Sequence, residues 1–332
     1  MSWENNRLPM NVASSPIGNG TFGQVFPGAD IIGNDLAVKY IQYSNEAEAR
    51  HAVSEGISLN ELEHENVVKV HHVSLKEPNY VAIATEMCNQ GDLDSFFKNN
   101  LMSTQMAKVI FMEMAHGLKY IHSKCYIHRD IKPQNIFMKD NKPKIGDLGL
   151  AYKTSNGFAQ GAGTPIFMAK ETLEHNLCSF QTDIWSFGLT VYWLLVGQNL
   201  YCEFAKNYNQ DVRSDRIGNR LIFLPHINRW WGVFIKRCIN VDVDARFKNM
   251  NEVTHDLSNI PANNWVYNES LKTWNNIGVR AGRRYEASLK GSNVCILNHP
   301  INGGNTMRIC NKKFGTEKEA GQFLRDYFYK NP

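Results

Sequence analysis

The sequence lacks paired cysteines, a secretion signal and any long apolar run. Its seven cysteines are scattered singly, with no Cys-x-x-Cys pair, which argues against a disulfide framework and predicts reduced thiols. The first residues, MSWENNRLPMN, contain no apolar stretch of the kind found in secretion signals. The richest apolar run, 184–196, includes Ser, Gly, Thr and Tyr and is shorter than the roughly 20 residues needed to span a bilayer. We interpret this run as a buried core helix and expect an intracellular protein of the cytoplasm, the nucleus or both.

Net charge is small over most of the chain and positive near its end. Residues 261–332 contain 11 Lys and Arg against 5 Asp and Glu, a net charge of +6. Residues 1–260 contain 25 against 27, a net charge of −2. A chain of 332 residues can form a domain of roughly 250 residues and a second small one. The change of charge therefore separates two predicted domains, 12–260 and 263–332.

The segment 126–135 carries the strongest chemical signal. It reads YIHRDIKPQN, and Asp147 follows twelve residues after Asn135. One short loop with Asp130, Lys132 and Asn135, followed by Asp147, provides a proton acceptor and two metal ligands for phosphoryl transfer. A bare His-Arg-Asp triplet also fits a solvated turn, so the interpretation depends on the ordered set. We predict Asp130, Lys132 and Asn135 as catalytic residues and Asn135 and Asp147 as metal ligands.

A glycine-rich segment lies upstream. Residues 17–25 read IGNGTFGQV, in which Gly18, Gly20 and Gly23 let the backbone approach phosphate groups closely. A dinucleotide-binding fingerprint shares this spacing, but it requires a helix directly after the glycines. Residues 24–26 instead continue as an extended stretch, Gln-Val-Phe, which favours a β-hairpin.

A strand ending in a single lysine and an amphipathic helix come next. Residues 36–39 read LAVK, as expected of a strand whose Lys39 contacts phosphates, although an exposed strand lysine gives the same pattern. Residues 47–63 contain helix formers with one apolar side. Several acids in and beside this helix could pair with Lys39, namely Glu46, Glu48, Glu55, Glu61 and Glu63.

Residues 12–260 resemble a complete eukaryotic-type protein kinase domain. The further signatures are TEMC at 85–88, GTPIFMAKE at 163–171, DIWSFG at 183–188 and Arg246 in CINVDVDARF. The segments HRDIKPQNIF and IGDLGLA are most similar to those of NIMA-related Ser/Thr kinases. The resemblance implies an α+β fold of two lobes, with a β-rich N-lobe and a mainly helical C-lobe, followed by a small module.

The same resemblance implies a Ser/Thr protein kinase that uses ATP and Mg²⁺ and acts on protein hydroxyl groups. Asp130 would accept the hydroxyl proton, and Lys132 beside Thr164 is typical of Ser/Thr kinases. Glu55 is selected as the partner of Lys39 because the turn HENVV follows its helix, as in protein kinases. The implied nucleotide-binding residues are Ile17, Gly18, Asn19, Gly20, Thr21, Phe22, Gly23, Gln24, Val25, Ala37, Lys39, Glu55, Glu86, Cys88, Asp92 and Phe137.

Within that set the resemblance assigns separate roles. Adenine would lie between Ile17, Val25 and Ala37 on one side and Phe137 on the other. The backbone at Glu86 and Cys88 would hydrogen-bond to it, with Asp92 near the ribose. For any single apolar member, ordinary core packing is the alternative. Three further residues have structural roles: Glu171 and Arg246 as an ion pair, and Asp183 as an acceptor for the backbone of the catalytic loop.

Three positions depart from the family pattern. Leu148 replaces the Phe of Asp-Phe-Gly, and Lys170 replaces the Pro of Ala-Pro-Glu. Gln160 stands where many kinases carry a phosphorylated Thr or Ser that pairs with Arg129. We therefore predict activity without phosphorylation at position 160. Phosphorylation of Thr154 or Ser155, or a hydrogen bond from Gln160, could act in its place.

Residues 263–332 predict a small α+β module of three strands and one helix. The strand candidates are 284–289, 294–297 and 306–310, with a turn at 302–304. A capping box at 316–319 begins the helix, whose apolar face consists of Ala320, Phe323, Leu324 and Tyr327.

The segments 277–280, 283–289 and 312–327 also distantly resemble plant-type AP2 DNA-binding domains. Localisation or partner binding through a basic surface is the alternative, as is a simply solvated face. If nucleic acid binds, affinity should fall steeply with salt, with phosphate contacts from Arg280, Arg283, Arg284, Lys312 and Lys313. An active kinase, a pseudokinase scaffold and a DNA-associated kinase thus all stay open. The presence of Lys39, Asp130, Asn135 and Asp147 disfavours the scaffold.

Overall fold

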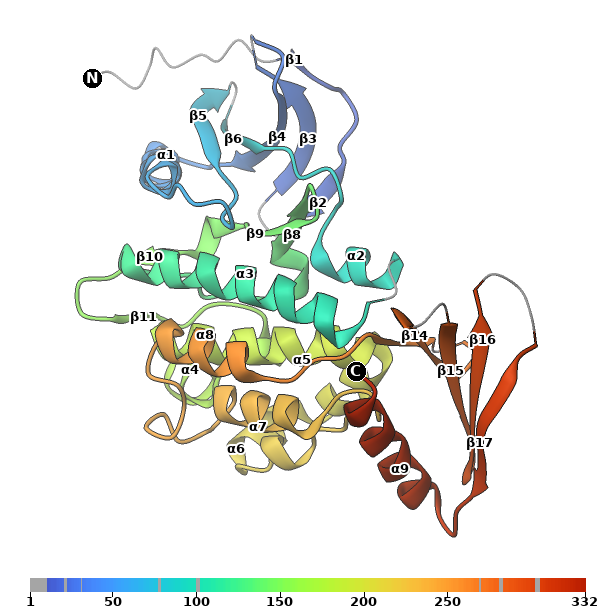
Figure 1. The fold of residues 1–332 in the computed structure, drawn as a ribbon. Helices are drawn as coiled ribbons and strands as arrows, with labels where there is room; N and C mark the ends of the chain where they lie inside the picture. The colour runs from blue at the N-terminus through green and yellow to red at the C-terminus, as the bar shows by residue number, and fades with distance from the viewer. Residues whose placement is uncertain are drawn as a thin grey trace.

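A computed structural model describes residues 11–20, 23–30, 32–76, 79–99, 102–268, 270–280, 283–301 and 305–332. Within these ranges the chain forms a strand-rich N-lobe, a helical C-lobe and a sheet with one helix beside the C-lobe (Figure 1).

An antiparallel sheet forms the N-lobe. Its order is β1, β3, β4, β6, β5, with β2 paired to β3. Leu36 and Val38 of β4 are fully buried in its core. Helix α1 (Glu46–Asn60) lies against β5, since a Cβ on Gly56 would come within 2.6 Å of Val73. The strands are β1 (Asn11–Val12), β2 (Gly18–Gly20), β3 (Gly23–Ala29), β4 (Asp35–Gln42), β5 (Val70–Lys76) and β6 (Tyr80–Glu86).

Helices form most of the C-lobe, around the central helix α5 (Phe180–Ala205). Every residue from 184 to 196 is buried, which confirms the predicted core helix. None of the helices in the described ranges is long and apolar enough to cross a membrane. The other helices are α2 (Leu93–Asn99), α3 (Thr104–Ser123), α4 (Lys170–His175), α6 (Tyr208–Arg213), α7 (Arg229–Cys238) and α8 (Met250–Asn259).

Short strand pairs connect these helices and carry the loops described below. They are β7 (Tyr126–Ile127) with β10 (Tyr152–Lys153), β8 (Ile136–Lys139) with β9 (Lys142–Ile145), and β11 (Phe158–Gln160) with β12 (Leu177–Ser179).

The C-terminal module is a five-stranded antiparallel meander covered on one face by helix α9 (Glu317–Lys330). The three expected strands are present, but two more precede them, so the three-strand prediction was wrong. The first missed strand is only four residues long, and the second is interrupted by Asn and Gly. The expected turn at 302–304 lies outside the described residues. The strands are β13 (Trp265–Asn268), β14 (Thr273–Arg280), β15 (Arg283–Lys290), β16 (Asn293–Pro300) and β17 (Met307–Lys313).

The capping box at the start of α9 is confirmed. Thr316 Oγ1 accepts from the Glu319 N–H at 3.2 Å, and the Glu319 carboxylate accepts from the Thr316 N–H at 3.3 Å. Ala320 and Leu324 are fully buried, as predicted, and Phe328 extends the same face one turn further.

Hydrogen bonds and stacked rings hold the module against the C-lobe. Trp274 Nε1 donates to His226 Nδ1 at 3.0 Å, and Tyr267 stacks on the same imidazole. Asn263 accepts from the Gln105 N–H through its carbonyl at 3.0 Å and donates through Nδ2 to the His226 carbonyl at 2.8 Å. Asn263, His226 and Trp274 are buried, so this contact between the C-lobe and the module is shielded from water.

His226 makes the stability of this seam depend on pH. Burial, with a smaller contribution from the Arg325 charge, lowers the pKa of His226 from 6.5 to about 3. The unfolded chain gains a proton on this imidazole as the pH falls below 6.5, whereas the folded chain stays neutral there until about pH 3. We expect the free energy of unfolding to be roughly 2 kcal/mol lower at pH 5 than at pH 7 from this group alone.

Urea unfolding of wild type and His226→Gln at both pH values measures this contribution. The glutamine keeps a hydrogen-bond acceptor for Trp274 but does not titrate, so the variant should lose about 2 kcal/mol less than wild type between pH 7 and pH 5. Equal losses in the two proteins would show that His226 takes up its proton in the folded state.

Candidate active site

The backbone of the catalytic loop is fixed by one buried carboxylate. Asp183, at the start of α5, is only 1 % exposed. It accepts the His128 N–H at 2.8 Å and the Arg129 N–H at 2.9 Å, which confirms the predicted contact. Its Oδ2 also lies 2.8 Å from His122 Nε2. These bonds hold Arg129 at a φ of +69°, in the left-handed region that a non-glycine residue rarely occupies.

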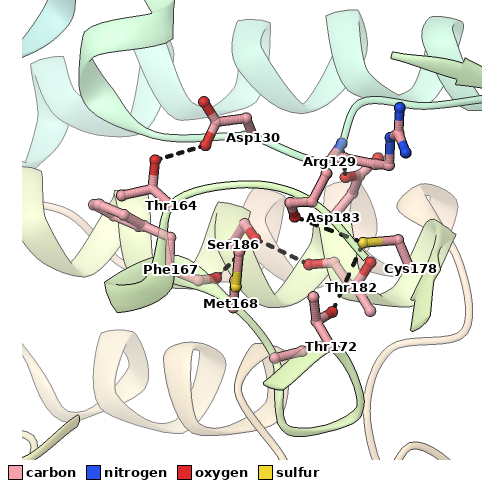
Figure 2. A pocket seen from close by; sticks show the side chains of 12 residues that line it. Arg129, Asp130, Thr164, Phe167, Met168, Thr172, Cys178, Thr182, Asp183 and Ser186 are labelled. Atoms are coloured by element: carbon pink, nitrogen blue, oxygen red, sulfur yellow. Dashed lines mark hydrogen bonds between the residues drawn. The ribbon is translucent and has the colours of Figure 1, made fainter. Parts of the chain in front are cut away.

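Asp130 is the centre of a polar cluster. Lys132 Nζ and Asn135 Nδ2 each donate to its Oδ2 at 2.8 Å. The Thr164 hydroxyl donates to its Oδ1 at 2.8 Å (Figure 2). Lys132 also donates to the Thr164 oxygen at 2.8 Å. Burial alone would raise the pKa of Asp130, but these donors outweigh it and lower the pKa below the usual value. The carboxylate is therefore ionised at neutral pH.

Asn135 and Asp147 offer oxygen ligands that suit a hard divalent cation. The Asn135 amide nitrogen donates twice to Asp130, to its carbonyl and to its Oδ2, which leaves Oδ1 as the ligand atom. No residue of the described ranges donates to that oxygen. The Gly146 N–H donates to the Asn135 carbonyl at 2.9 Å, so the chain brings Asp147 to the same place. The donor set fits Mg²⁺ chemically, and the metal roles stay predictions.

Lys39 and Asp147 form an ion pair across the two lobes. Lys39 Nζ lies 2.6 Å from Asp147 Oδ1, and both side chains are less than one-fifth exposed. Asp147 has a φ of +48°, again in the left-handed region. The backbone of Glu55 lies within α1, but its side chain is outside the described part of the structure, as is that of Asn19. The predicted pairing of Glu55 with Lys39 therefore stays a prediction.

The glycine-rich segment forms the expected hairpin of β2 and β3. Gly18 pairs with Val25 and Gly20 with Gly23, and no helix follows, which excludes the dinucleotide-binding alternative. Gly23 has a φ of +147°, and a Cβ there would lie 1.9 Å from the Tyr40 carbonyl oxygen. A side chain at this position is impossible without moving β4. Thr21 and Phe22, at the tip, lie outside the described residues.

The predicted adenine-binding residues are distributed over both lobes. Ile17 is 57 % exposed, whereas Val25 and Ala37 are half-buried in the sheet. Phe137, on β8, packs against Gly146, where a Cβ would lie 2.7 Å from its ring. Burial raises the pKa of Cys88 to about 11, so this thiol is neutral.

Asp92 accepts the Ser95 N–H at 2.9 Å and thereby caps α2. It also forms a backbone bridge with Phe137. The predicted contact of Asp92 with a ribose stays a prediction.

The stretch 147–171, from Asp147 to Glu171, is called the activation segment below, and the contacts that hold it involve protein groups alone. Arg129 Nε donates to the Leu150 carbonyl, and Nη1 donates to the Gln160 carbonyl at 3.0 Å. Its guanidinium also lies over the Tyr152 ring, 5.4 Å from the centroid. The bond to Gln160 involves the backbone, not the predicted side-chain amide. Arg129 thus connects the start of the activation segment, at Leu150, with its middle, at Gln160.

Thr154 has a structural contact set that the sequence did not reveal. It is 5 % exposed, its N–H donates to the Cys125 carbonyl at 2.9 Å, and its Oγ1 accepts the Phe158 N–H at 3.0 Å. The hydroxyl also lies 2.9 Å from the Phe158 carbonyl. Ser155, beside it, is exposed.

Buried hydroxyls anchor three successive carbonyls near the end of the segment. These bonds run from Tyr201 to Ile166 (2.8 Å), from Ser186 to Phe167 (2.9 Å) and from Tyr208 to Met168 (2.7 Å). A small pocket is lined by this stretch, by the first turns of α5, and by Thr172 and Cys178 (Figure 2). Each carbonyl of residues 166–168 is therefore held by one buried hydroxyl group.

At the other two departures from the family pattern, Leu148 and Lys170, the new side chain is buried in one case and ion-paired in the other. Leu148 is buried and apolar, at 6 % exposure. Lys170 Nζ reaches Asp215 Oδ1 at 2.7 Å, so an ion pair ties the start of α4 where a proline ring would stiffen it.

The predicted pair of Glu171 and Arg246 is confirmed. Arg246 Nη1 and Nη2 donate to the two Glu171 carboxylate oxygens at 2.7 and 3.2 Å. Nη1 also donates to the Gln181 carbonyl, and Nε donates to the Asn240 carbonyl. The Arg246 side chain is fully buried, so its charge depends on these acceptors.

Arg246→Ala should lower the free energy of unfolding by roughly 3 to 5 kcal/mol, because it leaves the Glu171 carboxylate unpaired in a mostly buried place. Arg237→Ala is the matched control. Arg237 also contacts two carboxylates, those of Glu252 and Asp256, but it is 41 % exposed and should cost about 1 kcal/mol or less. Urea unfolding of the three proteins compares the two losses, and equal losses contradict the assignment.

The basic residues proposed for DNA contact do not share one face. Arg283 donates to Asn298 Oδ1 at 3.1 Å on the helix side of the sheet, and Lys312 lies over Phe314 on that same side. Arg284 and Lys313 alternate onto the opposite, uncovered face. The Arg280 side chain is outside the described residues. Of the four described residues, Arg283 and Lys312 therefore lie on one face of the sheet and Arg284 and Lys313 on the other.

Comparison with known proteins identifies the family of the chain. A family model described as "Protein kinase domain" matches residues 12–258. Similar curated proteins include the serine/threonine-protein kinase atg1 of Dictyostelium discoideum, 29 % identical over 74 % of this chain and 39 % of that protein. Human serine/threonine-protein kinase ULK1 is 34 % identical over 59 % of this chain and 20 % of its own length. Mouse serine/threonine-protein kinase Nek5 is 34 % identical over 64 % of this chain and 35 % of its own length.

The aligned part thus spans well under half of each of these relatives. The family match covers more than half of the present chain, and the two-lobed architecture agrees with it. The chain belongs to the protein kinase domain family.

Proposed function

We propose that the protein is a Ser/Thr protein kinase that transfers the γ-phosphoryl group of Mg-ATP to protein hydroxyls. The observation that carries this proposal is the cluster around Asp130, in which Lys132, Asn135 and Thr164 all contact one ionised carboxylate. A scaffold without catalysis would not require this buried arrangement of charge.

The residues of the cluster divide the chemistry among them. Ionised Asp130 orients an incoming hydroxyl group and accepts its proton. Lys132, 2.8 Å from both Asp130 and Thr164, places a positive charge beside the group being transferred. A divalent cation bound by Asn135 and Asp147 would neutralise phosphate charge. Lys39, on the N-lobe, is placed to hold the non-transferred phosphates against Asp147.

Asp130→Asn should reduce phosphate incorporation into a generic Ser/Thr protein substrate by about 100-fold or more. The reason is that the amide keeps the shape of the side chain but cannot accept the proton. The measurement is the initial rate with magnesium-ATP, and leaving out the metal should abolish it.

Asp244→Asn is the control, because Asp244 is an exposed carboxylate in the loop before Arg246 and should leave the rate unchanged. Thermal unfolding of both variants separates lost chemistry from lost folding. Equal incorporation by wild type and Asp130→Asn would refute the proposed chemistry.

We further propose that the activation segment needs no phosphorylation. The support is the pair of carbonyl contacts of Arg129, the closed hydrogen-bond set of Thr154 and the three anchored carbonyls at 166–168. Since the Thr154 hydroxyl is already buried and engaged, it serves as a structural group and not as a phosphate acceptor.

Protein expressed in bacteria and treated with phosphatase should therefore show its full initial rate without a lag after ATP is added. Ser155→Ala should leave the rate unchanged, whereas Thr154→Ala should lower the free energy of unfolding by roughly 1 to 3 kcal/mol, and Thr154→Ser should retain most of it. A lag that disappears after preincubation with ATP, accompanied by phosphate within residues 150–171, would contradict the proposal.

For the C-terminal module we propose partner binding or localisation through the face that α9 leaves uncovered. Its exposed basic residues are Arg284, Lys290, Arg308 and Lys313. DNA binding remains the alternative, and a mobility shift of the whole protein with duplex DNA at low salt distinguishes the two. A NIMA-related origin also stays a prediction, because Nek5 and ULK1 are equally similar at 34 % identity.

A further inference from the structure

The segment that connects the lobes, residues 86–91 between β6 and α2, is bound at both ends to the β8–β9 hairpin. At its start, the Glu86 side chain is buried beneath the end of β6. Glu86 Oε2 accepts from Lys139 Nζ at 2.8 Å, and Oε1 lies 2.8 Å from Lys144 Nζ and accepts the Lys69 N–H at 2.9 Å. One carboxylate therefore joins the connecting segment to both strands of the hairpin.

The far end of the same segment is bound to the turn of the hairpin. Gln90 Nε2 donates to Asn141 Oδ1 at 2.9 Å, and the Asn141 N–H donates back to Gln90 Oε1 at 2.7 Å. The Gln90 N–H donates to the Met138 carbonyl, and the Met138 N–H donates to the Gly91 carbonyl. Asp140 and Asn141 both have positive φ, +52° and +62°, which is the geometry of a two-residue hairpin turn. This turn presents the Asn141 amide to Gln90.

The hairpin also carries the residues predicted to hold metal and nucleotide. Asn135 directly precedes β8, Asp147 comes two residues after β9, and Phe137 lies on β8. Gly146 leaves no space between Phe137 and Val68, since a Cβ there would approach both within 2.8 Å. The strands cannot shift without disturbing both the connecting segment and the metal ligands. Two parts of the site are thus set at a fixed separation by one short structural unit.

We propose that Glu86 and Gln90 are positioning residues for the nucleotide: their contacts with β8 and β9 hold the connecting backbone at the distance from Asn135 and Asp147 that ATP spans. This inference rests on the proposed kinase function and goes beyond it, because it assigns nucleotide affinity to side chains that need not touch the nucleotide. Burial disfavours the charged form of Glu86, yet its donors outweigh burial and lower its pKa, so the carboxylate stays ionised.

The test uses the whole protein with Glu86→Gln and, separately, Gln90→Ala. Glu86→Gln keeps the size of the side chain but leaves Lys139 and Lys144 without their shared counter-ion. Gln90→Ala removes both side-chain bonds to Asn141 at a half-buried position. Binding of a fluorescent ATP analogue and steady-state kinetics with ATP are measured for each.

We expect the Kd of the analogue and the KM for ATP to rise about tenfold in Glu86→Gln and several-fold in Gln90→Ala, with kcat within twofold of wild type. Lys142→Gln is the matched control. Lys142 lies on the same hairpin, but its ion pair is with the exposed Glu65 at 2.9 Å, away from the connecting segment. Its Kd and KM should equal those of wild type.

Each outcome has a distinct meaning. If wild type binds the analogue and both variants bind it equally well, the positioning role is wrong. A fall in kcat with unchanged Kd also overturns it, because that pattern indicates general damage to the catalytic loop. Wild-type protein that binds no nucleotide refutes the proposed kinase function itself, whatever the variants do.

Discussion

The site depends on the hydrogen bonds that the buried carboxylate of Asp183 accepts from the backbone of the catalytic loop. Removing a charge from water is costly, and here the cost is offset by two backbone N–H groups and the His122 ring. In return, the chain adopts a turn at Arg129 that a non-glycine residue would otherwise avoid. That turn directs Asp130 towards Lys132 and Thr164, and it directs Arg129 towards the activation segment.

A second constraint is the extent to which backbone carbonyls, and not side chains, are the acceptors. Arg129 bonds to the carbonyls of Leu150 and Gln160, and three buried hydroxyls hold the stretch at 166–168. A backbone acceptor is present whatever the residue, so the segment keeps its shape although position 160 carries no phosphate acceptor. This is the physical basis for an activation segment that is already ordered.

The sequence predicted that Asp130, Lys132 and Asn135 share one loop, and the structure brings their side chains into contact. This contact was predictable because the three residues lie close together in the chain, and their catalytic roles stay predictions. It also predicted the Glu171–Arg246 pair, through resemblance. It did not predict the role of Thr154 or the carbonyl contacts of Arg129, because a backbone carbonyl leaves no mark on the residue type. Two module strands were missed for a related reason: β14 contains Asn and Gly, and its pairing with β13 and β15 compensates for their weak strand preference.

The seam between the C-lobe and the module shows that sequence families and folding units can have different boundaries. The family match ends at residue 258, yet Asn263 covers the first turn of α3, and Trp274 completes the hydrogen bonding of His226. A chain cut at the family boundary would expose His226 and the Thr104 hydroxyl to water. Residues beyond the end of the family match therefore supply part of the C-lobe's interior.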